Sequence, residues 1–225
     1  MGLEARSLSA VLAFILAVTG MGGSIPPGDA EHVLLLVNRE HPVGFAYVPE
    51  PLVRPNVLPA PGKEENITLR PEAAAALEKL FQAAQREGIT LYAVSGYRSY
   101  YTQKRLFQSK AAEVGERQAM RTVATAGTSE HQLGLAMDIN GQTTLKKGLS
   151  RAFAESPEGK WVAENAQRYG FIIRYPQGKT KITGYAWEPW HLRYVGVEAA
   201  MQVYALDITF EEYHLLMEMA EAAYE

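Results

Sequence analysis

Two short segments of the sequence concentrate polar residues that could bind a metal ion. One reads SEHQLGLAMDI and the other EPWHLRY, and together they supply His131, Asp138 and His191, each beside an apolar stretch. The sequence contains no cysteine, so histidine or carboxylate side chains must hold any metal. Zinc accepts such nitrogen and oxygen ligands, and a catalytic zinc site leaves its fourth position to water. The three residues are therefore candidate ligands of a catalytic zinc ion.

A glutamate accompanies these candidate ligands. Glu188 lies three residues before His191, at an expected turn into a strand, so its carboxylate could point across the metal at a bound water and handle protons. His131 and Asp138 are seven residues apart, which suits a loop followed by a strand better than one face of a helix. Spacing alone leaves other roles open, such as a packed core histidine, a turn cap or a surface carboxylate.

Three motifs in a fixed order resemble a known family. Residues 129–138 read Ser-x-His-x-x-Gly-x-Ala-x-Asp, residues 188–194 read Glu-x-Trp-His-x-Arg-Tyr, and residues 95–99 read Ser-Gly-Tyr-Arg-Ser with Gln103 following. From about Leu34 to Gly196 the chain resembles the VanY-type zinc D,D-/L,D-carboxypeptidases. That family shares its metal core with the D-Ala-D-Ala dipeptidases and with phage L-alanyl-D-glutamate endopeptidases. The three motifs together are specific, whereas any one of them alone is not.

The resemblance implies a role for each polar residue. His131, Asp138 and His191 would hold one Zn²⁺ per chain, which lowers the pKa of its water to about 7 and polarises the scissile carbonyl. Glu188 would pass the proton of that water to the leaving amine, which commonly speeds a reaction about 10²–10⁴-fold. Arg98 would clamp the terminal carboxylate of the substrate through two parallel hydrogen bonds. An ordinary ion pair is the alternative role for Arg98.

Further side chains are expected to complete the substrate site. Under the same resemblance, Gln103, Ser129 and Tyr185 are supporting hydrogen-bond donors. Trp187 and Trp190 could wall the cleft.

The resemblance predicts an enzyme that removes the C-terminal D-alanine from peptidoglycan stem peptides. The preference between D,D- and L,D-linked substrates is left open. An endopeptidase that cuts inside the stem is one alternative, because the metal core is shared, and Arg98 favours the carboxypeptidase. A non-catalytic wall-binding module stabilised by zinc is the other. Structural zinc sites usually have four protein ligands, whereas this set offers three and a free Glu188, which favours catalysis.

These residues need a scaffold that mixes helices and strands without regular βαβ alternation. We expect helices over residues 71–87, 101–114, 116–122, 159–169 and 210–224, and strands over 89–94, 135–139, 171–175 and 190–195. Leu106 and Phe107 are expected to be buried. The pattern predicts an α+β domain with a small, largely antiparallel sheet flanked by helices. The resemblance adds a zinc site in a cleft over that sheet, as in Hedgehog and the D,D-peptidases.

The chain divides into three parts. Residues 1–24 contain an apolar run that suits a signal peptide or an N-terminal anchor. Residues 25–66 are rich in proline and predict an extended wrap, with a short strand over 32–37. Residues 67–225 would form the catalytic domain with its C-terminal helix. We therefore expect an extracytoplasmic protein of the bacterial cell wall, secreted or tethered to the outer face of the cytoplasmic membrane through an uncleaved N-terminal segment.

Composition bounds the partners. Of the 225 residues, 47% are hydrophobic, which supports a packed core, and the net charge is −3 without a long basic run, which argues against nucleic acid as a partner. A monomer is expected, although apolar residues of the last helix could pack on the domain or make a dimer contact. Surface or packing roles are expected for the other histidines, His32, His41 and His214.

Overall fold

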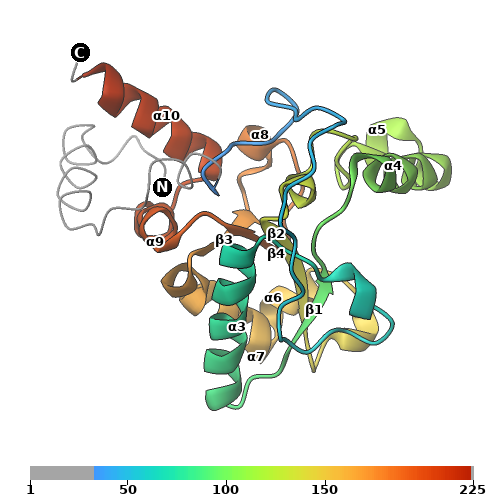
Figure 1. The fold of residues 1–225 in the computed structure, drawn as a ribbon, viewed down its shortest axis with the longest axis vertical. Coiled ribbons are helices and arrows are strands. Elements are labelled where there is room, and N and C mark those ends of the chain that lie inside the picture. The colour runs from blue at the N-terminus through green and yellow to red at the C-terminus, as the bar shows by residue number, and fades with distance from the viewer. Residues whose placement is uncertain (1–32, 224–225) are drawn as a thin grey trace.

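The computed structural model describes residues 33–223, and its centre is a four-stranded sheet (Figure 1). The strand order is β1-β2-β4-β3, and every neighbouring pair is antiparallel. The strands are β1 (Leu91–Ser95), β2 (Ala136–Gly141), β3 (Phe171–Tyr175) and β4 (Glu188–Tyr194). The predicted α+β class with a small antiparallel sheet is confirmed.

Helices surround this sheet (Figure 1). The α-helices are α3 (Pro71–Arg86), α4 (Tyr100–Val114), α5 (Glu116–Ala119), α6 (Ala152–Glu155), α7 (Pro157–Asn165), α8 (Thr180–Thr183), α9 (Val197–Leu206) and α10 (Phe210–Ala222). Short 3-10 helices are η2 (Glu64–Asn66), η3 (Glu130–Leu133), η4 (Leu145–Lys147) and η5 (Ala166–Tyr169). In Figure 1, α4 and α5 lie on the opposite side of the molecule from α9 and α10. Within residues 33–223, no helix has both the length and the apolar character needed to cross a bilayer.

The core fixes the two central strands. Pro71 starts α3 at its first turn, and the apolar face of this helix buries Leu77 and Leu80 against the sheet. All six residues of β2 are buried, and Leu192 of β4 belongs to the same core. Because β2 and β4 are the two inner strands of the sheet and are largely buried, side chains that project from them are held in fixed positions.

Two expectations about burial and strand structure are wrong. Leu106 is 43% exposed and Phe107 is only partly buried, because α4 packs mainly on α5 and buries only Gln103. Residues 33–37 form no strand. Their carbonyl groups at Val33 and Leu35 instead accept hydrogen bonds from Arg193 Nη2, both at 2.8 Å, so a guanidinium takes the place of a neighbouring strand.

The ends of several helices differ from the predicted ones. The helix expected over 116–122 ends at Ala119, and the one expected over 159–169 is divided into α7 and η5. Helix α9 was not predicted; its sequence, VEAAMQVYAL, carries a single charged residue and therefore shows no polar face. The expected export segment, residues 1–24, lies outside the described residues, as does His32.

Candidate metal centre

Three candidate ligands meet on the sheet. Asp138 of β2 and His191 of β4 are directly paired across the antiparallel ladder, and His131 comes from η3, just before β2. One potential ligand atom from each residue lies within 4.8 Å of the others. Their exposures are 2% for His131, 5% for Asp138 and 3% for His191. The structure thus brings together the three predicted ligands from two distant segments.

A tight turn between η3 and β2 places His131. Gly134 has φ +68°, a left-handed conformation that favours glycine, and an added Cβ would lie 2.9 Å from Leu52 Cδ2. The Gly134 carbonyl accepts a hydrogen bond from the Arg70 backbone N–H at 2.8 Å. Glycine in the motif therefore serves the turn that returns the chain from His131 into the strand bearing Asp138.

The His131 ring is oriented by the loop that follows β1. Its Nδ1 lies 2.7 Å from the Gly96 carbonyl oxygen, which can only accept, so Nδ1 carries the proton and the Nε2 lone pair is free. Nε2 is 3.3 Å from Asp138 Oδ2. Glycine is needed at 96 because a Cβ would lie 2.4 Å from the Thr68 carbonyl oxygen. Burial, and then the Arg98 charge, lower the pKa of His131 to about 4, which keeps the ring neutral.

The His191 ring uses its nitrogens the other way round. Nδ1 lies 3.0 Å from Asp138 Oδ1, whereas Nε2 faces Glu130 Oε2 at 3.5 Å. Burial alone would lower the pKa of His191, but the Asp138 and Glu130 carboxylates outweigh burial and raise it to about 9. His131 therefore faces Asp138 through Nε2, whereas His191 faces it through Nδ1.

These donors fit a zinc ion. His131 Nε2 is fully buried and has no hydrogen-bond partner among residues 33–223, a state that is costly unless a ligand occupies it. Burial would raise the pKa of Asp138, but His131 and His191 hold it well below its usual value, so the group is a carboxylate. Two imidazoles and one carboxylate form a typical three-residue set for catalytic zinc.

The side of the centre away from the core opens into a cavity of 210 Å³. Six other residues predicted for the site line this cavity together with the three candidate ligands: Arg98, Gln103, Ser129, Tyr185, Glu188 and Trp190. Tyr175, which was not predicted, also lines it, whereas Trp187 does not. Spacing in the sequence could not show that the predicted residues share one cavity, because they come from three separate segments, 98–103, 129–138 and 185–191.

Glu188 stands at the edge of this cavity. It is the first residue of β4, opposite Tyr175 in the ladder with β3. Burial raises the pKa of Glu188 to about 7, and the nearby Asp138 charge acts in the same direction. A carboxyl group with this pKa can both accept and donate a proton near neutral pH.

Arg98 follows β1 and is anchored at one edge. Its Nη1 donates to Gln103 Oε1 at 3.1 Å, and its Nη2 lies 3.3 Å from Asp138 Oδ2. Gln103 is itself fixed, because its Nε2 donates to the Ala124 carbonyl at 2.7 Å. Arg98 Nε is buried and has no partner among residues 33–223. The guanidinium thus lines the cavity, and its Nε–H group has no partner in the part of the chain that the structure describes.

Sequence reasoning missed three charged residues behind His191. Glu130, Arg174 and Arg193 are 1%, 0% and 0% exposed. Two of them lie inside the recognised motifs, and Arg174 interrupts the apolar strand FIIRY. A charged residue in a strand that is otherwise apolar was the available signal, since such groups are rarely buried without a partner.

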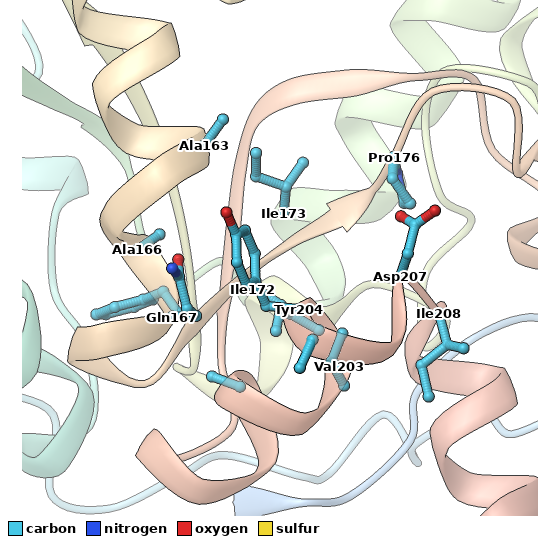
Figure 2. Close-up of a pocket in the computed structure, with 13 residues that line it drawn as sticks. Ala163, Ala166, Gln167, Ile172, Ile173, Pro176, Val203, Tyr204, Asp207 and Ile208 are labelled. Atoms are coloured by element: carbon cyan, nitrogen blue, oxygen red, sulfur yellow. The ribbon is translucent and has the colours of Figure 1, made fainter. Parts of the chain in front are cut away.

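A second cavity lies beside β3 and has a different character (Figure 2). Its volume is 510 Å³, and its walls come from α7, η5, β3 and α9, with Ala163, Ile172 and Val203 among them. Among residues 33–223, Asp207 is the only carboxylate that lines it. The larger cavity therefore lacks the converging ligands and titratable groups of the smaller one.

The sequence of this chain matches a family model and a named carboxypeptidase. Residues 66–197 match the family model "VanY: D-alanyl-D-alanine carboxypeptidase". YodJ of Bacillus subtilis (strain 168), named as a carboxypeptidase, is 48% identical over 186 residues, which cover 82% of this chain and 68% of YodJ.

Solved structures agree with the match. The LdcB LD-carboxypeptidase superposes with a TM-score of 0.77 at 46% identity, over 85% of this chain and 92% of that one. A VanY D,D-pentapeptidase variant solved with Zn(II) superposes with a TM-score of 0.69 at 37% identity, over 82% and 99% of the two chains. The fold, the motifs and the converging ligands thus have one explanation: this chain belongs to the VanY family of D-alanyl-D-alanine carboxypeptidases.

Proposed function

We propose that this chain is a zinc-dependent carboxypeptidase that removes the C-terminal D-alanine from peptidoglycan stem peptides. One observation carries the proposal: Glu188 and Arg98 line the same small cavity that His131, Asp138 and His191 face. A proton-handling carboxyl group and a carboxylate-binding guanidinium on the open side of a three-ligand site are the parts that this reaction needs.

Recognition of the chain end falls to Arg98. A planar guanidinium binds a carboxylate through parallel hydrogen bonds, and Gln103 holds this one in a fixed orientation. Ser129 and Tyr185 can donate hydrogen bonds to the peptide from the cavity wall, and Trp190 supplies an apolar surface. Only a substrate with a free terminal carboxylate would engage Arg98, which favours removal of the last residue over cleavage inside the stem.

Proton transfer falls to Glu188. When bound, zinc supplies Lewis-acid polarisation of the scissile carbonyl and lowers the pKa of water. The Glu188 carboxylate accepts the proton of the attacking water and delivers it to the leaving amine as the carbon–nitrogen bond breaks. Its pKa of about 7 suits both halves of this task.

The substrate indicates where the protein works. Peptidoglycan stems are assembled into the wall outside the cytoplasmic membrane, so we place the enzyme there, secreted or tethered. Residues 1–24 would serve as the export signal or anchor, 25–66 as a wrap around the catalytic domain of residues 67–225, and the protein would act as a monomer.

The test uses zinc-loaded protein and two free stem peptides, a pentapeptide that ends in D-Ala-D-Ala and a tetrapeptide that ends in one D-alanine. Products are identified by mass spectrometry. Loss of a single alanine from either peptide is the expected result, and the preferred peptide defines the D,D- or L,D-preference. A folded, zinc-loaded protein that cuts only inside the stem, or cuts neither peptide, would overturn the proposal. The Glu188→Gln variant is the matched control for contaminating peptidases.

A further inference from the structure

A cluster of buried charges lies directly behind His191, on the side away from the cavity. Glu130 of η3 contacts Arg174 of β3 and Arg193 of β4, and all three side chains are fully buried. None of the three lines the cavity of the candidate site. Their role is therefore not contact with a substrate.

The two oxygens of Glu130 have different neighbours. Oε1 accepts from Arg174 Nε at 2.7 Å and from Arg193 Nη1 at 2.8 Å. Oε2 has no hydrogen-bond partner among residues 33–223 and lies 3.5 Å from His191 Nε2, which also has none. The gap is a few tenths of an ångström longer than an ordinary N–H···O bond. These two buried atoms therefore face each other, and neither has another hydrogen-bond partner among residues 33–223.

This arrangement suits a metal ligand. An imidazole that binds a metal through one nitrogen usually donates the N–H of its other nitrogen to a carboxylate or carbonyl, which fixes the tautomer and the ring orientation. Since His191 Nδ1 faces Asp138, Nε2 is the nitrogen left to donate. Glu130 Oε2 is placed to accept. The Gly96 carbonyl accepts the corresponding hydrogen bond from His131 Nδ1.

The arginines keep Glu130 charged and in place. A buried carboxylate is costly unless it is paired and hydrogen-bonded, and Glu130 has two guanidinium partners. Arg193 Nη2 is itself fixed by two backbone carbonyls, those of Val33 and Leu35. Arg174 forms a bidentate ion pair with Glu211 at the start of α10. Its Nη1 donates to Oε2 at 2.8 Å and its Nη2 to Oε1 at 2.5 Å.

We propose that Glu130 is a positioning residue that holds His191 for the metal ion, and that Arg174 and Glu211 connect this support to α10. The inference rests on the zinc site of the proposed function but not on its substrate. It assigns the glutamate of the SEH motif and the arginine of the WHLR motif to support of a ligand.

The first test measures Zn²⁺ affinity by competition with a chelating dye. Glu130→Gln should weaken zinc binding about 10- to 100-fold, the usual effect of losing such a support. Glu158→Gln is the matched control, because Glu158 is also buried and hydrogen-bonded, to Thr143, but lies outside the site. It should leave zinc affinity unchanged. A folded Glu130→Gln protein with wild-type zinc affinity would overturn the inference, whereas absence of zinc binding by the wild type would overturn the proposed function with it.

The second test needs no variant and therefore does not depend on how the substituted protein folds. Long-range ¹H–¹⁵N spectra of the zinc-loaded wild-type protein report which nitrogen of each histidine carries a proton. We expect a proton on Nε2 of His191 and on Nδ1 of His131. An unprotonated Nε2 on His191 would exclude Glu130 as its hydrogen-bond acceptor and refute the proposal.

Discussion

The metal centre has two sides, and they differ in what they can do. On the open side, Glu188 and Arg98 line a cavity, and Arg98 Nε has no hydrogen-bond partner among residues 33–223. On the closed side, Glu130 and two arginines are shielded from solvent, and Glu130 contacts both arginines and His191. The difference indicates that the two sides have separate roles. Residues of the open side should determine the catalytic rate, and residues of the closed side should determine the zinc affinity.

The three candidate ligands line the open cavity, and His191 also contacts the closed side, so loss of a ligand should have the largest effect. His131→Ala removes a nitrogen donor whose other nitrogen is already fixed by Gly96. We expect both zinc binding and peptidase activity to be lost, as measured by metal content after gel filtration and by D-alanine release. Full zinc content in a folded His131→Ala protein would show that the ion is held elsewhere.

Glu188→Gln tests the open side. The amide cannot accept the proton of water, so kcat should fall about 10²–10⁴-fold. Zinc affinity should stay within a few-fold of the wild-type value, because Glu188 lies outside the ligand set. Dye competition and steady-state kinetics on the same preparation measure both quantities. A variant that loses zinc affinity and activity in parallel would contradict the division into two sides.

Arg98→Lys tests substrate binding on the same side. Lysine keeps the charge but cannot form the two parallel hydrogen bonds, so kcat/KM for free stem peptides should fall about 10- to 100-fold, the equivalent of one charged hydrogen bond. A peptide with an amidated C-terminus should be a poor substrate for the wild type and should lose little more with the variant. Equal losses on both peptides would argue against a carboxylate clamp.

Glu211→Gln tests the far end of the closed side and should have the smallest effect on the metal. Glu211 is three contacts away from His191, with Arg174 and Glu130 between them. We expect a fall in zinc affinity smaller than that of Glu130→Gln. Stability of the ion-free protein should fall by about 1–3 kcal/mol, because Arg174 loses one charged partner. Denaturant unfolding measures the stability. An effect on zinc binding larger than that of Glu130→Gln would break the proposed order of support.

The open side was largely predictable from sequence, and the closed side was not. The motifs contain residue types that commonly bind metals, transfer protons or bind carboxylates. The structure places five of these residues at one cavity: His131, Asp138, His191, Glu188 and Arg98. Arg174 stands in no such motif, and its contact with Glu130 joins residues 44 positions apart. Pairings between buried charges depend on tertiary packing, which periodicity does not encode.

The same contrast holds for the fold. The strand expected over 171–175 was right to the residue, because an apolar run between a glycine and a proline marks its ends. The strand expected over 32–37 was wrong for its described part, because an apolar run needs a neighbouring strand. Here the Arg193 side chain occupies the carbonyls instead. The expectation that Leu106 is buried was wrong for a related reason: α4 packs mainly on α5, and Gln103 is the residue of this helix that is buried.

The most direct test of the account is anomalous diffraction at the zinc edge from crystals of the zinc-loaded protein. We predict one ion per chain, bound by His131 Nε2, Asp138 and His191 Nδ1, with a non-protein oxygen in the remaining position and Glu188 beside it but not bound to the metal. An ion closed off by a fourth protein ligand, or no ion between these three residues, would contradict the account.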